Sequence, residues 1–170
     1  MSQDALEAAL RGVPRAEYGD KYAEHVVEQY KLYVEMVDRI SARRQTANSF
    51  FLSINTALLA FAGLLASDRQ APEAPLSWIL AVATAGVLLC YSWYRLVRSY
   101  RDLNSGKFRV VHAMERLLPL APYQAEWESV GRGEDPRLYL SFTHLELRVP
   151  WVFIALYVIL VLYRGAVALQ

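Results

Sequence analysis

The sequence predicts an all-α membrane protein with three transmembrane helices, two of them extended into long cytoplasmic helices, that forms a homo-oligomer. Three observations predict this: three long uncharged segments, a strong asymmetry in the positions of Lys and Arg, and helical periodicity that continues beyond two of the segments. The 170 residues have the length of a single unit. The net charge of +1 offers no field that would attract nucleic acid, and one cysteine, Cys90, cannot form an intrachain disulfide.

The three predicted spans differ in length. Residues 46–67 and 76–94 give 22 and 19 uncharged residues, each long enough to cross a hydrocarbon core of about 30 Å at 1.5 Å per residue. Residues 149–163 give only 15. We expect this third span either to be short or to extend past Arg164, with that side chain reaching the interface. The alternative for this segment is a buried core helix.

The positions of Lys and Arg predict the orientation. Seven precede the first span and nine lie in residues 95–148, against one, Arg69, between the first two spans and one, Arg164, after the third. Basic residues are enriched on the cytoplasmic side of membrane proteins. We therefore expect an inner-membrane protein with a cytoplasmic N-terminus and a periplasmic tail at residues 164–170. Residues 1–45 have no apolar core of a signal peptide.

A helical stripe of apolar and aromatic residues precedes the first span. Its members recur at spacings of four, four, three, four and three, and they are Tyr22, Val26, Tyr30, Tyr33, Val37 and Ile40. After a flexible segment at 1–19, we expect a helix from Asp20 through residue 45 and on through the first span. The stripe needs a partner, either residues 107–118 of the same chain or a neighbouring subunit.

The second span is predicted to continue into a cytoplasmic helix at 95–118, with a break at Ser105 and Gly106. Pro119 and Pro122 end that helix. We expect residues 119–148 to form a cytoplasmic loop, irregular in its first part, and residues 20–163 to form one membrane domain.

Four polar residues of the first span are candidates for a pore lining or a subunit interface: Asn48, Ser49, Asn55 and Thr56. Asn48 and Asn55 are seven residues apart and so share a helical face. Polar residues within a span usually face protein or water rather than lipid. The alternative is ordinary adhesion between helices, at about 0.6 kcal/mol per hydrogen bond.

In the second span, Ser77, Ala81 and Ala85 form a ridge of small residues at i, i+4 and i+8, which predicts a packing seam. The third span carries bulkier side chains and is predicted to face lipid.

Arg95, Arg98 and Arg101 follow the second span on one face and are candidates for binding anionic lipid headgroups. The alternative is that they only set the topology by their charge.

No motif of a catalytic, cofactor or metal site emerges. The three histidines are scattered without ligand spacing, and the glycines around Arg132 lack the ending of a phosphate loop. We therefore expect no cofactor and no enzymatic activity. An alternative, a membrane-bound enzyme, would need a pocket of ionisable residues in the cytoplasmic part, drawn from Arg109, His112, Glu115, Glu126 and His144.

Several short motifs, in order and spacing, resemble the RipA family of small bacterial cytoplasmic-membrane proteins. They are Arg43 to Phe51 with Asn55 and Thr56, Trp93 to Arg95 with Ser99 to Arg101, Leu103 to Ser105, Lys107 and Phe108, Pro122 and Tyr123 with Glu126 and Trp127, and Thr143 with Glu146. The resemblance covers roughly residues 20–163. It implies an octamer in a bacterial inner membrane, and it implies no catalytic residues because the family is not known to be enzymatic.

We thus expect a homo-oligomeric inner-membrane scaffold or channel-like assembly with the first span near its axis, contacting itself and membrane lipids and no nucleic acid. A looser similarity to two-span pore-forming effectors of bacterial defence leaves a second class open, a pore gated by a cytoplasmic ligand or partner.

Overall fold

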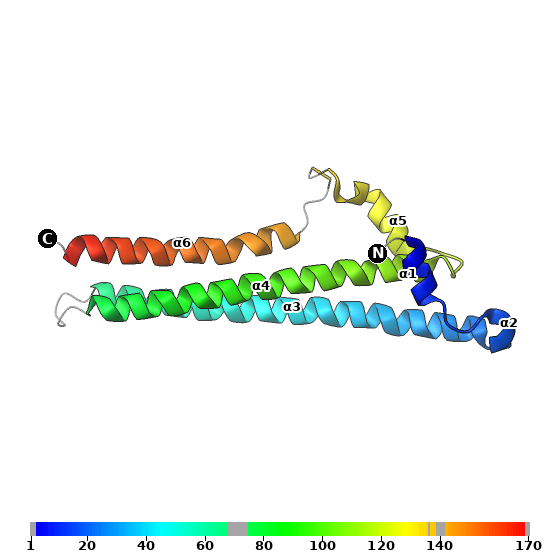
Figure 1. Cartoon of the computed structure of the whole chain (residues 1–170). Coiled ribbons are helices and arrows are strands. Elements are labelled where there is room, and N and C mark those ends of the chain that lie inside the picture. Colours follow the sequence, from blue (N-terminus) through cyan, green and yellow to red (C-terminus); the bar gives the residue numbers. More distant parts are fainter. Residues whose placement is uncertain (1–2, 68–74, 136, 139–141, 169–170) are drawn as a thin grey trace. The chain divides into compact units, whose positions relative to one another are not determined.

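A computed structural model shows only helices among the residues that it describes, which are all except 1–2, 68–74, 136, 139–141 and 169–170 (Figure 1). In chain order the elements are α1 (Gln3–Leu10), α2 (Arg15–Tyr18), α3 (Tyr22–Ser67), α4 (Leu76–Glu115), α5 (Pro122–Ser129), the 3₁₀ turn η1 (Gly131–Gly133) and α6 (Phe142–Ala168). The predicted all-α fold class is confirmed.

The chain divides into two compact units. The first, here called the extension unit, comprises Met1–Arg43 and Tyr100–Ser141, and the second, the membrane unit, comprises Arg44–Ser99 and Phe142–Gln170. Helices α3 and α4 each contribute to both units.

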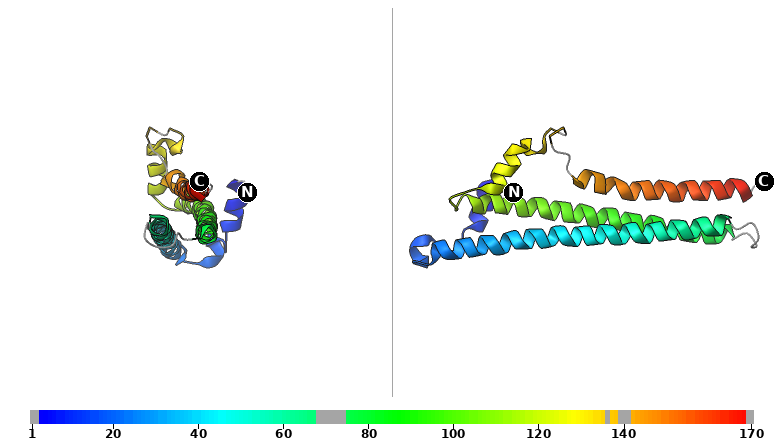
Figure 2. Two further views of the ribbon diagram at one scale, coloured as in Figure 1. Left: turned by 90° about the vertical axis from the view of Figure 1, so that its left-hand side faces the viewer. Right: turned by 180° about the vertical axis from the view of Figure 1, so that it is seen from behind.

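In the membrane unit α3, α4 and α6 run side by side (Figures 1 and 2). Three helices of the described chain are long and apolar enough to cross a membrane. One buried face of α4 forms the centre of the unit, with its residues at alternating spacings of four and three: Ile79, Ala83, Gly86, Cys90, Trp93 and Val97. An ion pair between Arg44 Nε and Glu146 Oε2, at 3.6 Å, links α3 to the start of α6.

The third span is longer than its uncharged core of residues 149–163. Its apolar part covers Leu145–Val167, and helix α6 continues to Ala168. Arg164, expected to begin a C-terminal tail, lies inside this helix and is only 9% exposed. The helix therefore continues past Arg164, while the limits of the span in the membrane stay a prediction. Gly165, Ala166 and Val167 continue an apolar surface that favours a helix over a tail.

In the extension unit the predicted stripe on α3 is confirmed. All six stripe residues are buried or half-buried, whereas the charged residues of the opposite face are exposed and include the pairs Lys31–Glu28 and Arg39–Glu35. The partner is α4 of the same chain, because Lys107 Nζ lies 4.7 Å from the centre of the Tyr33 ring.

Three local expectations differ from the structure. Helix α4 passes through Ser105 and Gly106 without a break, since one glycine costs a helix only about 1 kcal/mol and packing on α3 offsets it. The segment expected to be irregular forms α5, which begins at Pro122 because proline suits the first turn of a helix. The N-terminal segment expected to be flexible forms α1 and α2, and Glu7 of α1 pairs with Arg116.

Candidate functional site

Asn55 joins the three helices of the membrane unit. Its side chain is fully buried, and its Oδ1 atom accepts hydrogen bonds from the Cys90 thiol of α4 and from the Tyr157 hydroxyl of α6, both at 3.2 Å. Its Nδ2 atom donates to the carbonyl of Phe51 at 2.8 Å. A buried amide must find such partners, and here its own protomer supplies all of them. This placement does not fit the predicted role of Asn55 at a pore or a subunit interface.

Asn48 lies on the same face of α3, as its spacing predicted, and it also contacts its own chain. The indole N–H of Trp93 donates to Asn48 Oδ1 at 2.7 Å, and the ring of Trp93 stacks on Phe51 with the centroids 5.8 Å apart. Trp93 is only 2% exposed. For both asparagines the structure therefore favours the alternative role, adhesion between helices within one protomer.

The contact between Gly86 and Tyr157 was not predicted. Tyr157 is fully buried, and a Cβ atom on Gly86 would lie 2.1 Å from its ring, so only glycine leaves room for it. The available signal was that Gly86 is the one glycine of the second span. The sequence could not show which aromatic residue of the third span would fill the space.

Ser49 and Thr56, the other two candidates of the first span, are exposed on the protomer. The Thr56 hydroxyl donates to the carbonyl of Leu52 at 2.8 Å. Because this bond satisfies the hydroxyl within α3, Thr56 can lie in an apolar environment. Around them α3 presents further small exposed residues, namely Ser53, Ala57, Ala60 and Gly63. These six residues are called the α3 small face below.

The predicted seam of Ser77, Ala81 and Ala85 is also exposed on the protomer. The face continues through Thr84 and Ser92, with the exposed Leu88 between them, and the five small residues are called the α4 small face. It lies opposite the buried face of α4. The seam within the protomer is instead built by Ala83, Gly86 and Cys90, so the predicted ridge remains available to other molecules.

The outward surface of α6 is different in kind. It consists of large apolar side chains that are between 43% and 66% exposed: Trp151, Val152, Leu156, Val158, Ile159, Leu162 and Tyr163. This fits the prediction that the third span faces lipid, although Tyr157 anchors α6 to the other two helices.

Of the three arginines after the second span, Arg95 and Arg98 are exposed and belong to the membrane unit. Arg101 belongs to the extension unit, where it pairs with Asp102 at 2.9 Å. The predicted set is therefore divided, and Arg95 and Arg98 are the members that present their charge at the surface of the membrane unit.

Glu115 is a buried carboxylate at the end of α4, only 1% exposed. It accepts hydrogen bonds from the backbone N–H groups of Tyr123 at 2.8 Å and Gln124 at 2.9 Å, and from the Tyr30 hydroxyl at 3.1 Å. Because α5 has no side-chain cap of its own, Glu115 caps that helix and ties it to α3 and α4. Burial raises the pKa of Tyr123.

The other residues named for an enzymatic pocket differ in exposure. Arg109 and Glu126 are exposed, and His112 is half-buried beside Phe108. His144 belongs to α6 and the membrane unit, and its side chain lies outside the described part of the structure. Among the described residues no group of three or more His, Cys, Asp or Glu could hold a metal ion.

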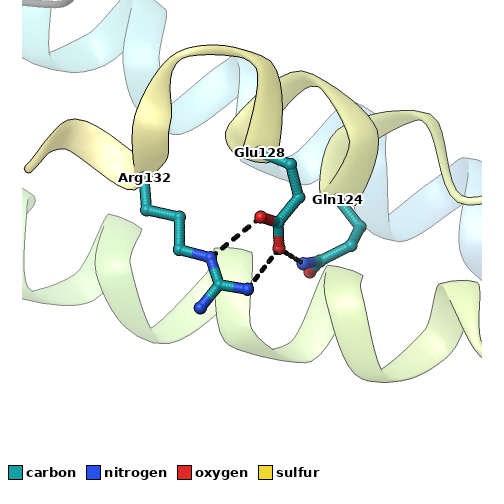
Figure 3. Close-up of polar contacts among 3 residues, drawn as sticks. All are labelled: Gln124, Glu128 and Arg132. Atoms are coloured by element: carbon teal, nitrogen blue, oxygen red, sulfur yellow. Dashed lines mark hydrogen bonds and ion pairs between the residues drawn. The ribbon is translucent and has the colours of Figure 1, made fainter.

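A second carboxylate in the same region, that of Glu128, is exposed to solvent. Arg132 donates to both oxygens of Glu128, at 2.7 and 2.9 Å, and Gln124 donates to the same group (Figure 3). The hydrogen bonds from Arg132 hold the pKa of Glu128 below its usual value. Arg132 has a φ of 54°, which is uncommon for a residue other than glycine, and the bidentate pair holds its side chain in one place.

A protein-family model described as the Octameric membrane protein family (8xMP) matches residues 27–166, most of the chain. No curated protein and no solved structure matches this chain. The matched part begins within α3, so α1 and α2 lie outside it.

Proposed function

This chain belongs to the octameric membrane protein family, and from that premise we propose that it forms a non-enzymatic, channel-like homo-octamer in a bacterial inner membrane. In the proposed assembly α3 lies near the symmetry axis, the small faces of α3 and α4 meet between subunits, and α6 faces lipid.

The observation that carries this proposal is that α3 and α4 each expose a row of small residues beside large apolar ones such as Phe61 and Leu80, whereas the exposed surface of α6 is mostly large and apolar. The α3 and α4 small faces consist of Ser, Thr, Ala and Gly, whereas α6 presents large apolar side chains. Lipid tails solvate large apolar groups well, so no hydrophobic force brings such surfaces together. Small residues instead let two backbones approach closely, and this is how helices recognise one another in a membrane.

Two different small faces suit a closed ring. In a head-to-tail ring each subunit offers one surface to the neighbour on one side and another surface to the neighbour on the other side. Pairing of the α3 small face with the α4 small face of the next subunit meets this requirement. The hydroxyls of Ser49 and Thr56 are then the polar groups of α3 that lie in this contact, because Asn48 and Asn55 are occupied within the protomer.

For the orientation, we propose that the extension unit is cytoplasmic. Support comes from the sixteen Lys and Arg that precede the first span or lie between the second and the third. Arg95 and Arg98 then lie at the inner leaflet, where each contributes about 1 kcal/mol of attraction to anionic headgroups.

The proposal assigns no catalytic residue. Glu115, the buried carboxylate of the extension unit, uses its acceptor capacity to cap α5 and to hold Tyr30. An acid engaged in this way is a structural group.

Cysteine cross-linking in membranes tests the subunit contact. In a Cys90→Ser background, Ser53→Cys combined with Ser92→Cys should give a ladder of covalent multimers under oxidation, because the pairing of Asn55 with Cys90 puts these two sites at the same level of the two small faces. The matched control pairs Ser53→Cys with Ile159→Cys on the lipid-facing surface of α6 and should stay monomeric. Equal ladders from both pairs would refute the proposed contact.

Ion flux separates a channel from a scaffold. The purified octamer reconstituted in liposomes should release a trapped monovalent cation, whereas empty liposomes should retain it. An octamer that holds the gradient as well as empty liposomes do would be a scaffold instead.

A further inference from the structure

The extension unit carries an apolar groove that its own chain leaves open. The groove has a volume of about 460 Å³ and lies between α3 and α4, with Leu10 at the end of α1 as part of its wall. Its apolar lining comes mainly from Leu32 and Met36 of α3 and from Val110 and Met114 of α4.

Leu32 and Met36 do not belong to the stripe that packs α3 onto α4. They are 64% and 45% exposed, far more than the stripe residues Tyr33 and Val37 beside them. Large apolar side chains exposed to water are unfavourable, at about 25 cal/mol for each Å² of apolar surface. In the proposed orientation this unit lies outside the lipid, so a protein surface that covers these groups would stabilise the assembly.

The spacing of the groove residues fits a helix as the occupant. Leu32 and Met36 are four residues apart on α3, and Val110 and Met114 are four residues apart on α4. Two neighbouring helices with apolar residues at this spacing form a groove into which the side chains of a third helix can insert. Leu10, the last residue of α1, already lines the same groove.

The charges of the rim do not favour a small ionic ligand. Glu35 and Arg39 both line the groove, but they pair with each other at 2.6 Å. The neutral rim and apolar floor therefore favour a partner that brings apolar side chains.

We propose that this groove receives a helix from a second copy of the chain, and that the octamer is held together outside the membrane as well as within it. The inference rests on the proposed function, because it takes the neighbour from the octamer. Membership of an octameric family supplies that neighbour. The groove lies on α3 and α4, the two helices that carry the small faces proposed to meet in the membrane. A ring with both contacts would resist dissociation better than one held by small residues alone.

Maleimide labelling of single cysteines tests the proposal in the full chain. Leu32→Cys in the Cys90→Ser background is compared with Leu120→Cys, whose native side chain is 78% exposed in the same unit and does not line the groove. In the purified octamer, Leu32→Cys should react about tenfold or more slowly than Leu120→Cys, because a covered site reacts only when the contact opens. After dissociation to protomers the two rates should become equal.

The outcomes are distinct. If the protein is octameric by native mass spectrometry and Leu32→Cys still reacts as fast as Leu120→Cys, the groove is open and this inference is overturned while the proposed function stands. Protection in native membranes that is lost in the purified octamer would also overturn it, since another protein or a lipid surface would be the cover. Absence of the octamer would overturn the proposed function, and the inference with it.

A second variant keeps the test independent of cysteine chemistry. Leu32→Glu should shift the purified protein from octamers toward smaller species, whereas Leu120→Glu should not. Because Leu32 and Leu120 are both exposed in the protomer, both variants should keep the helical circular dichroism of the unmodified protein. Octamers as stable as those of the Leu120→Glu control would contradict the proposal.

Discussion

Each unit of this protein buries one polar side chain that ties three helices together, but the two side chains differ in charge. In the membrane unit it is the amide of Asn55, which is bonded by Cys90 and Tyr157. In the extension unit it is the carboxylate of Glu115, which is bonded by Tyr30 and the start of α5. A charge at the centre of a bilayer costs about 3 kcal/mol, whereas an amide makes similar bonds without a net charge.

The difference also lies in what each group stabilises. Glu115 faces the positive end of a helix, where a carboxylate is favoured and satisfies backbone N–H groups that no other side chain caps. Asn55 joins side chains that would each find other partners in a partly dissociated membrane bundle. The comparison predicts that loss of the charged group destabilises the protein more than loss of the amide, and four substitutions test it.

The largest loss of stability is expected at Gly86, where the Tyr157 ring leaves no space for a side chain. Gly86→Leu would place side-chain atoms inside the ring of Tyr157, so α6 must move away and the bonds of Asn55 to Tyr157 must break. Overpacking of this kind costs about 3 kcal/mol or more. The melting temperature followed by circular dichroism should fall sharply, and Ala155→Leu on the exposed surface of α6 is the control. Equal stability of the two variants would mean that α6 does not pack on Gly86.

Glu115→Leu should cause the next largest loss of stability. It leaves the first N–H groups of α5 and the Tyr30 hydroxyl without their acceptor, at a cost of about 2–3 kcal/mol. Glu115→Gln keeps the shape and part of the acceptor capacity and should cost less. Hydrogen exchange of the α5 amides would report the loss directly. Unchanged exchange in Glu115→Leu would show that this carboxylate does not cap α5.

Asn55→Leu should destabilise the membrane unit by about 1 kcal/mol, less than the loss of Glu115. The Tyr157 hydroxyl retains a hydrogen bond to the backbone carbonyl of residue 55 at 3.4 Å, which reduces the loss of stability. Thr56→Val, one residue away on the exposed surface, is the matched control for protomer stability. A larger loss for Asn55→Leu than for Glu115→Leu, measured by denaturant titration in one detergent, would reverse the comparison.

The smallest effect is expected at Glu128, which also accepts three hydrogen bonds but lies at the exposed surface. Glu128→Gln should leave the melting temperature at neutral pH unchanged. Because Arg132 lowers the pKa of Glu128 in the folded protein, any contribution of the pair is present above the unfolded pKa and is lost as the pH falls through the folded pKa. A clear drop in melting temperature at neutral pH would show that the number of bonds matters more than burial.

Much of the fold follows from local pattern. The uncharged segments locate the three spans, and the stripe from Tyr22 to Ile40 correctly identifies the face of α3 that packs within the extension unit. The helix at Pro122 was missed because its cap, Glu115, is seven residues earlier and is a partner only after the chain has turned.

The candidate site was predicted less well, for a physical reason. Asn48, Ser49, Asn55 and Thr56 were grouped by polarity, but in the structure the two asparagines bond to helices of their own protomer while Ser49 and Thr56 stay exposed. Periodicity assigns residues to a face of a helix and cannot say which neighbour that face will meet.

The sequence alone determined the helical class, the number and approximate limits of the spans, and the polar or apolar character of each helix face, because these depend on residues close together in the chain. Only the tertiary structure decided that Tyr157 fills the space above Gly86, that Asn55 is enclosed by three helices, and that the small residues of α3 and α4 remain outside. Those outcomes depend on side chains up to a hundred residues apart and on whether their shapes and hydrogen bonds match when the helices pack.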